Sequence, residues 1–140
     1  MSKPEAPSCV RNQEPILAVL RNHFADRQNV LEIGSGTGQH AVFFAAALSH
    51  LNWQTSERPE NLAGIQAWLD EAALPNTPAP LALDVNATWP NQRFDAVFSA
   101  NTLHIMSWRE VQQLFVRLPD VMTENGLLTI YGPFNYGDRY

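Results

Sequence analysis

The sequence predicts an α/β fold in which one mostly parallel sheet is covered by helices on both faces. Apolar runs of strand length alternate with helical patterns along the chain, which is the order of repeated strand–helix units. In one unit, a glycine-rich turn joins the apolar run Val30–Ile33 to an apolar helix at Ala41–Leu48, as in nucleotide-binding α/β proteins. The 140 residues are 45% hydrophobic and 16% charged, which predicts one globular domain spanning residues 1–140.

The start of the chain is expected to be flexible and then helical. Residues 1–11 contain two prolines and no apolar pattern. A first helix is predicted at Glu14–Phe24, with Asn12 as its cap and Pro15 in its first turn.

The other elements follow from periodicity and from turn residues. Ser107 and Glu110 have the spacing of a capping box, and Asn125-Gly126 predicts a turn before the last strand. The predicted strands are Val30–Ile33, Asn52–Ser56, Leu81–Leu83, Phe94–Ala100 and Leu127–Tyr131, and the predicted helices are Ala41–Leu48, one beginning at Pro59 and one beginning at Ser107.

The turn Gly34-Ser35-Gly36-Thr37-Gly38 predicts a ligand site. Glycines allow a sharp turn and let a ligand approach the backbone without meeting a Cβ. N–H groups at the start of the next helix then face that ligand. Gly38 comes one residue too early for a dinucleotide fingerprint, and Gln39 stands where that pattern has glycine. An ordinary tight turn is the alternative interpretation.

Carboxylates follow the predicted strands at the end of the sheet where such proteins bind ligands. Glu57 follows the second strand and can accept hydrogen bonds from ribose hydroxyls, unless it is a solvated turn residue. Asp84 follows the third strand and is otherwise a cap or turn residue. Glu32 precedes the first glycine by two positions.

The pattern Glu32-x-Gly34-x-Gly36-x-Gly38 resembles motif I of class I S-adenosylmethionine (SAM) methyltransferases. The resemblance covers roughly Val30 to Tyr131 and implies a Rossmann-like, doubly wound sheet with strands one to five of that family's core. The chain is more closely similar to a branch of methyltransferase-like proteins with no assigned substrate. That similarity is carried by Arg11–Leu17, Gly34–His40, Leu81–Val85, Asn101 with His104, and Tyr131-Gly132-Pro133.

The resemblance implies SAM as the cofactor. In the family, the glycine turn packs against the methionine part, and the acidic residue at Glu32 helps to hold the cationic end, as expected for opposite charges. The family often places an acid such as Asp84 beside the adenine amino group, with Val85 lining the adenine face. The implied cofactor-binding residues are Glu32, Gly34, Ser35, Gly36, Thr37, Gly38, Gln39, His40, Glu57, Arg58, Asp84, Val85, Asn101 and Thr102. The branch usually has aspartate where this chain has Glu57.

The segment Asn101–His104 implies the reaction. In the family it borders the transferable methyl group, and its form here resembles small-molecule methyltransferases rather than the N-P-P-Y type. His104 is the candidate catalytic residue because it can take a proton from a hydroxyl or amine; a packing or orienting role is the alternative. Methyl transfer to a small-molecule acceptor is therefore expected. The other functions considered are a non-catalytic SAM-fold binding or assembly module and a nicotinamide-dependent oxidoreductase.

Composition narrows the expected partners. The net charge is −5 and the nine Lys and Arg residues are scattered, which argues against nucleic acid. Cys9 is the single cysteine and the histidines are dispersed, so no disulfide or metal site is expected. No apolar run has the length of a membrane span and no signal-peptide pattern is present, so a cytoplasmic location is expected.

The resemblance also implies two further strands that this sequence does not show after Tyr131. The chain is therefore expected to be C-terminally incomplete relative to the class I core. The strand Leu127–Tyr131 would then lie at a sheet edge, where unpaired backbone groups recruit other strands. Either self-association through this edge or weak solubility of the isolated chain is expected.

Overall fold

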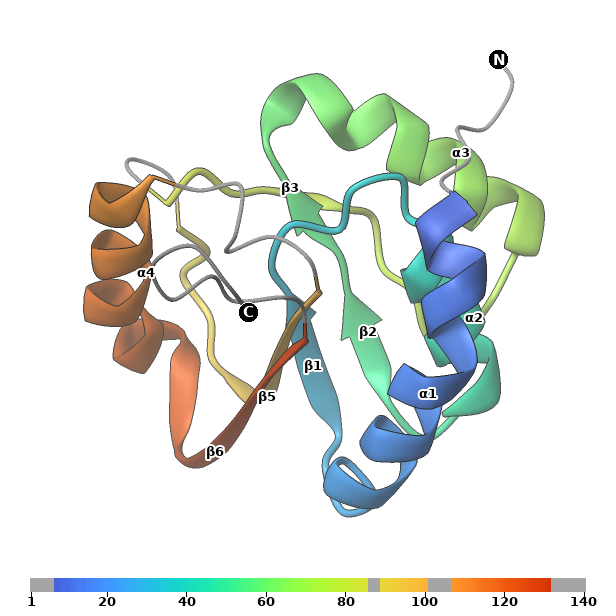
Figure 1. The fold of residues 1–140 in the computed structure, drawn as a ribbon, viewed down its shortest axis with the longest axis horizontal. Coiled ribbons are helices and arrows are strands. Elements are labelled where there is room, and N and C mark those ends of the chain that lie inside the picture. The colour runs from blue at the N-terminus through green and yellow to red at the C-terminus, as the bar shows by residue number, and fades with distance from the viewer. Residues whose placement is uncertain (1–6, 86–88, 101–106, 132–140) are drawn as a thin grey trace.

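The computed structural model describes residues 7–85, 89–100 and 107–131. Figure 1 shows strands in the centre, with α1 and α2 on one side and α4 on the other. The helices are α1 (Pro7–His23), α2 (Gln39–Ala47), α3 (Leu62–Ala72) and α4 (Trp108–Val121), with a short 3₁₀ helix, η1 (Pro59–Asn61). The strands are β1 (Asn29–Glu32), β2 (Asn52–Gln54), β3 (Ser56–Glu57), β4 (Leu81–Ala82), β5 (Phe94–Ala100) and β6 (Met122–Tyr131).

The strands run parallel, which confirms the predicted doubly wound α/β fold. The main sheet has the order β2-β1-β5-β6, and β3 pairs with β4 in a second, two-stranded sheet. In the main sheet, Val30 lies opposite Trp53 of β2 and Ala96 of β5. The strand order reverses between β1 and β5, so the carboxyl ends of these strands flank the crevice where such sheets bind ligands.

Side chains alternate between the two faces of the sheet. Val30 and Phe98 pack with α1 and α2, whereas Leu31 and Val97 pack with α4. The first face carries an aromatic cluster in which Phe44 of α2 lies 5.7 Å from Trp53 and 5.8 Å from Phe98, measured between ring centroids. The two layers bury most of β1 and β5, which support the residues that follow them.

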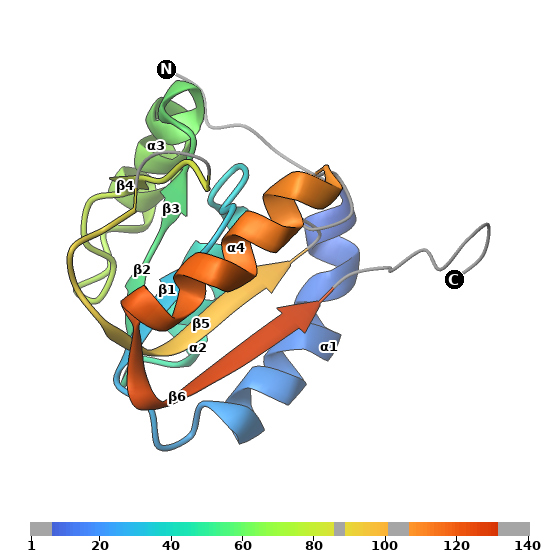
Figure 2. The same ribbon diagram turned by 90° about the vertical axis from the view of Figure 1, so that its left-hand side faces the viewer.

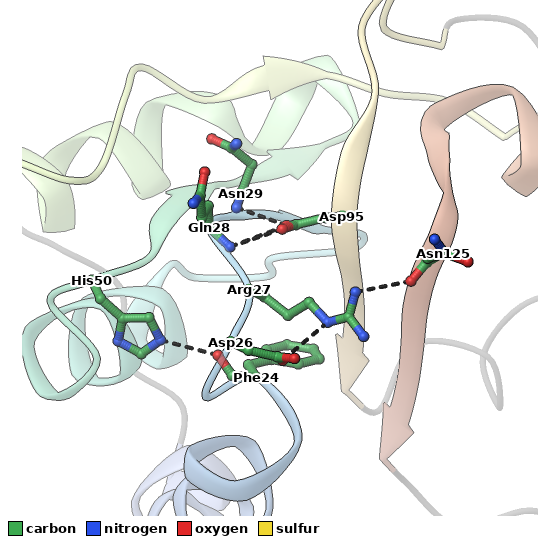
Figure 3. Close-up of polar contacts among 8 residues, drawn as sticks. All are labelled: Phe24, Asp26, Arg27, Gln28, Asn29, His50, Asp95 and Asn125. Atoms are coloured by element: carbon green, nitrogen blue, oxygen red, sulfur yellow. Dashed lines mark hydrogen bonds and ion pairs between the residues drawn. The ribbon is translucent and has the colours of Figure 1, made fainter.

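Polar contacts close the amino end of the sheet, opposite the glycine turn (Figure 3). The carboxylate of Asp95 accepts hydrogen bonds from the backbone N–H groups of Gln28 (2.9 Å) and Asn29 (2.8 Å). Arg27 donates to the carbonyl oxygen of Asn125 at 2.8 Å. These contacts tie the start of β1 to β5 and β6 at the amino end of the sheet.

The first helix begins earlier than predicted. Residues 7–11, expected to be loose, are helical, and the predicted cap Asn12 lies inside α1. Pro15 is an internal residue rather than a first-turn residue. Its ring nitrogen cannot donate to the carbonyl of Arg11, but burial of Ile16 and Leu20 against α2 and the sheet holds the helix together. Packing of α1 against α2 and the sheet therefore outweighs the tendency of proline to begin a helix.

The second predicted strand, Asn52–Ser56, is divided into β2 and β3 at Thr55. Gln54 donates from its side-chain amide to the carbonyl oxygens of Thr55 (2.9 Å) and Ala79 (2.8 Å). Figure 2 shows β3 and β4 lying beyond β2, away from β5 and β6. The division lets Glu57 leave the main sheet and face the turn after β1.

The last strand begins at Met122 rather than at Leu127. Its register against β5 shifts between Phe94, opposite Met122, and Ala96, opposite Leu127. The predicted turn at Asn125-Gly126 lies within this bulge, so the chain passes from α4 into β6 without leaving the sheet. Among the described residues only β5 pairs with β6, and self-association through the other edge stays a prediction.

None of the helices in the described ranges is both long enough and apolar enough to span a membrane.

Candidate functional site

The candidate site is the glycine turn that joins β1 to α2. Gly34, Gly36 and Gly38 have φ angles of 73°, 61° and 92°. Residues with a Cβ rarely adopt this left-handed region, so the backbone path requires glycine at each position. The turn ends at the N-terminus of α2, where Gly38 is the cap and provides no side-chain oxygen.

Gly36 and Gly38 differ in how much space surrounds their Cα atoms. A Cβ added to Gly38 would lie 3.1 Å from the Cα of Ile65 in α3, so Gly38 allows α2 and α3 to pack closely. A Cβ added to Gly36 would meet nothing within 4 Å. Gly36 therefore borders open space, and a ligand can lie directly against its backbone.

Glu57 lies beside this open space. Its Oε2 accepts a hydrogen bond of 2.8 Å from the backbone N–H of Gly36, and its Oε1 accepts one of 2.9 Å from that of Arg58. The backbone N–H of Leu83 donates to the carbonyl oxygen of Glu57 at 2.9 Å, which brings the half-buried Asp84 to the same end of the sheet. The structure thus brings together the carboxyl ends of β1, β3 and β4.

Glu32 lies behind the turn with its side chain buried. Its Oε1 accepts hydrogen bonds from the Ser35 hydroxyl (2.8 Å) and from the Trp53 indole N–H (3.2 Å). Burial raises the pKa of Glu32 to about 7, because desolvation outweighs these two hydrogen bonds and the carboxylate of Glu57 adds a smaller upward shift. Glu32 therefore changes charge close to neutral pH.

Serine side chains hold the turn in place. The backbone N–H of Ser35 donates to the carbonyl of Ser56 (2.9 Å), and the backbone N–H of Ser56 donates to the Ser35 hydroxyl (3.0 Å). The hydroxyl of Ser56 donates to the carbonyl of Glu32, and that of Ser99 donates to the carbonyl of Ile33 at 2.9 Å. Ser35 was predicted from the sequence as a site residue, whereas Ser56, Ser99 and the hydrogen bond of Trp53 were not. In the sequence, the only feature that could have indicated these three residues is a serine or a tryptophan close to the carboxyl end of a predicted strand.

His40 occupies the first turn of α2. It is 6% exposed, and its ring stacks on that of Phe44 with centroids 5.2 Å apart and planes 6° apart. Burial lowers the pKa of His40, which keeps the imidazole neutral at neutral pH. Neither ring nitrogen has a hydrogen-bond partner in the described part of the chain. Before it, the N–H of Gln39 donates to the Thr37 hydroxyl at 3.1 Å.

The outer rim of the site joins β3 to α4. Arg58 Nη2 lies 2.9 Å from Glu110 Oε2, and the Arg58 side chain is half exposed. Glu110 and Ser107 form the predicted capping box, with hydrogen bonds of 3.0 and 3.1 Å. A hollow of about 490 Å³ adjoins them and is lined by Ser107, Arg109, Glu110 and Gln113.

The remaining predicted site residues are less closely grouped. Val85 is buried in the core cluster under α4. Asn101, Thr102 and His104 lie outside the described residues. The described residues contain no group of three His, Cys, Asp or Glu that could hold a metal ion.

Over residues 3–140 the chain matches a family described as a protein of unknown function, DUF938. The chain belongs to the DUF938 family. This family agrees with the predicted branch, which has no assigned substrate.

Solved methyltransferases share the fold of this DUF938 protein. The SAM-dependent methyltransferase SibL has 23% identity and a TM-score of 0.78, covering 88% of this chain and 36% of its own. The mitomycin 7-O-methyltransferase MmcR has 18% identity and a TM-score of 0.79, covering 93% of this chain and 38% of its own. A coclaurine N-methyltransferase was solved with N-methylheliamine and S-adenosylhomocysteine (SAH). It has 15% identity and a TM-score of 0.71, and the match covers 92% of this chain and 38% of its own.

These similarities confirm the predicted class I methyltransferase fold. The chain spans little more than a third of the length of each of these proteins.

Proposed function

We propose that this protein binds SAM at the glycine turn and transfers its methyl group to a small-molecule acceptor. The observation that carries the proposal is the pairing of an open backbone at Gly36 with a fixed carboxylate at Glu57. The fold shared with SAM-dependent methyltransferases supports it.

The residues at the turn fit this cofactor. Gly36 leaves room for a ligand against the backbone, and each oxygen of Glu57 has a second lone pair with which to accept a ribose hydroxyl. Because the N–H groups of Gly36 and Arg58 already orient that carboxylate, little entropy is lost when it binds a ribose. Asp84 is the proposed partner of the adenine amino group. Glu32, whose pKa is about 7, contributes negative charge behind the turn when it is ionised.

When bound, SAM supplies a sulfonium methyl group that a nucleophile can displace. The protein's own contribution is to hold nucleophile and methyl group in line, which is the main source of rate in such a reaction. We assign the proton-accepting role at the acceptor to His104, and the contacts beside the methyl group to Asn101 and Thr102. These three residues lie outside the described part of the chain.

A small-molecule acceptor is favoured over nucleic acid. The net charge is −5 and the nine Lys and Arg residues are scattered along the sequence, which disfavours binding to a phosphate backbone. The solved neighbours include mitomycin and coclaurine methyltransferases, in agreement with the form of the segment Asn101–His104.

Isothermal titration calorimetry with SAM, SAH and NADH tests the proposed cofactor. We expect SAM and SAH to bind, NADH not to bind, and Gly36→Val to abolish binding while the protein stays folded. Binding of NADH alone would favour an oxidoreductase. SAM binding with no SAH produced from phenol, catechol and amine acceptors would favour the non-catalytic binding module.

A further inference from the structure

Asn125 and Gly126 form the only Asn-Gly pair in the sequence, and they lie in the irregular part of β6. Met122 and Leu127 have partners in β5, and among the described residues the stretch 123–126 between them pairs with no residue of that strand. Asn125 is exposed. Because residues in a bulge lie outside the ladder of hydrogen bonds, pairing with β5 does not fix the main chain between Asn125 and Gly126.

An exposed asparagine followed by glycine is chemically labile. The main-chain nitrogen of Gly126 can attack the side-chain carbonyl carbon of Asn125, since glycine has no Cβ to shield that nitrogen. A new C–N bond forms, the side-chain amide C–N bond breaks, and ammonia leaves with the proton from Gly126. Water then opens the resulting cyclic succinimide. Attack at the side-chain carbonyl gives aspartate, and attack at the main-chain carbonyl gives isoaspartate.

The bulge itself favours glycine at position 126. A Cβ added to Gly126 would lie 3.0 Å from Cε of Met122 and 3.1 Å from the main-chain oxygen of Thr123. The methionine methyl group can move aside, but the main-chain oxygen moves only if the bulge changes shape. A larger residue, which would slow the attack by shielding the nitrogen, therefore fits poorly here, and the fold preserves the labile pair.

Arg27 contacts one of the two carbonyl groups that water can attack. Its Nη1 donates a hydrogen bond of 2.8 Å to the main-chain oxygen of Asn125 (Figure 3), and its side chain is 22% exposed. A hydrogen-bond donor on a carbonyl oxygen stabilises the negative charge that develops there when water adds to the carbon. In isoaspartate the same oxygen belongs to a carboxylate, to which Arg27 donates a stronger, charge-assisted hydrogen bond. Both effects favour isoaspartate over aspartate.

We propose that Asn125 is a site of spontaneous deamidation and that Arg27 directs the product toward isoaspartate. The modification adds a negative charge and lengthens the main chain of β6 by one carbon atom, directly before Leu127, which lies opposite Ala96 of β5. The longer chain disturbs this register and lowers the stability of the protein. The proposal is independent of SAM binding.

The test ages the folded protein at pH 8 and compares it with the same chain aged in urea, where Arg27 no longer contacts Asn125. Peptide mapping by mass spectrometry measures the replacement of the amide NH₂ by OH, and electron-transfer fragmentation distinguishes isoaspartate from aspartate. Asn125→Gln is the control at the site, because its longer side chain disfavours ring closure. Arg27→Met removes the donor and keeps most of the apolar stem. Circular dichroism reports whether each variant is folded.

We expect the folded wild type to gain mass at Asn125 and to form a larger share of isoaspartate than the chain in urea. Folded Arg27→Met should still be deamidated, with the product ratio of the chain in urea. Aged wild type should melt at a lower temperature than fresh protein, whereas Asn125→Gln should not change with age.

Two results would overturn the proposal. If Asn125 stays intact in the folded protein while the chain in urea is deamidated, the fold protects the site. If the folded wild type and the chain in urea give the same product ratio, Arg27 does not direct the reaction. This second comparison needs no variant, so it holds even if Arg27→Met fails to fold.

Discussion

The carboxylate of Glu57 accepts a hydrogen bond of 2.8 Å from the backbone N–H of Gly36, which joins the last residue of β3 to the turn after β1. The two residues are 21 positions apart in the chain. The contact places a carboxylate beside the open backbone of Gly36, and it makes the proposed ribose site a preformed feature of the fold.

Gly36 and Gly38 should respond differently to alanine. Both have positive φ, which costs about 1–2 kcal/mol with a Cβ. Gly38→Ala also places its Cβ 3.1 Å from Ile65 and should lose about 1–3 kcal/mol more from overpacking. Urea unfolding should show the larger loss for Gly38→Ala, and calorimetry should show weaker SAM binding for Gly36→Ala. Equal stability losses would contradict the packing role of Gly38.

Glu57→Ala should weaken SAM binding by about 1–3 kcal/mol through loss of hydrogen bonds to the ribose. Glu60→Ala is the matched control, since it removes the same charge from an exposed residue of η1. Calorimetry on both variants separates a local contact from a general effect of charge. If the two variants bind SAM equally well, Glu57 does not hold the ribose.

Glu32 should make stability depend on pH. Its pKa is about 7 in the folded protein against 4.5 as a model value, so the folded state binds more protons than the unfolded state between these values. The contribution of Glu32 to the free energy of unfolding is fully present below about pH 4.5, and it is lost as the pH rises to about 7. This pKa shift corresponds to a change of roughly 3 kcal/mol in the free energy of unfolding.

Glu32→Gln checks this sign, because glutamine has an oxygen for Ser35 and Trp53 but no charge. Urea unfolding at pH 5, 6, 7 and 8 should show the variant gaining stability relative to the wild type as the pH rises. A difference that stays constant over this range would show that Glu32 has an ordinary pKa.

Trp53→Phe should destabilise the protein by about 1–3 kcal/mol, because it removes the indole donor to Glu32 from a fully buried position. The loss should be larger at pH 8 than at pH 5, since the ionised carboxylate depends more strongly on the hydrogen bond. Because that bond lowers the pKa of Glu32, the pKa should rise further in the variant. Chemical denaturation at both pH values measures the effect. A loss independent of pH would assign Trp53 a packing role alone.

Asp95→Ala should lower stability and spare ligand binding. Asp95 accepts hydrogen bonds from the N–H groups of Gln28 and Asn29 at the amino end of β1 (Figure 3), and their loss should cost about 1–3 kcal/mol. SAM affinity, measured by calorimetry below the unfolding temperature, should stay unchanged. Weaker binding would show that the two ends of the sheet are coupled.

Features that depend on nearby residues were predictable from the sequence. Alternating apolar patterns predicted the strand–helix order, and Ser107 with Glu110 predicted the cap of α4. The glycine turn was equally predictable, because positive φ at Gly34, Gly36 and Gly38 is a local requirement that glycine meets.

Tertiary packing determined how distant segments meet. It divided Asn52–Ser56 at Thr55, began β6 at Met122, buried Glu32 beneath Trp53 and left His40 without a partner. Burial and pKa depend on every group packed around a side chain. For Glu32 those groups include the indole of Trp53, 21 residues along the chain, which no local pattern connects to it, so only folding assigns its surroundings.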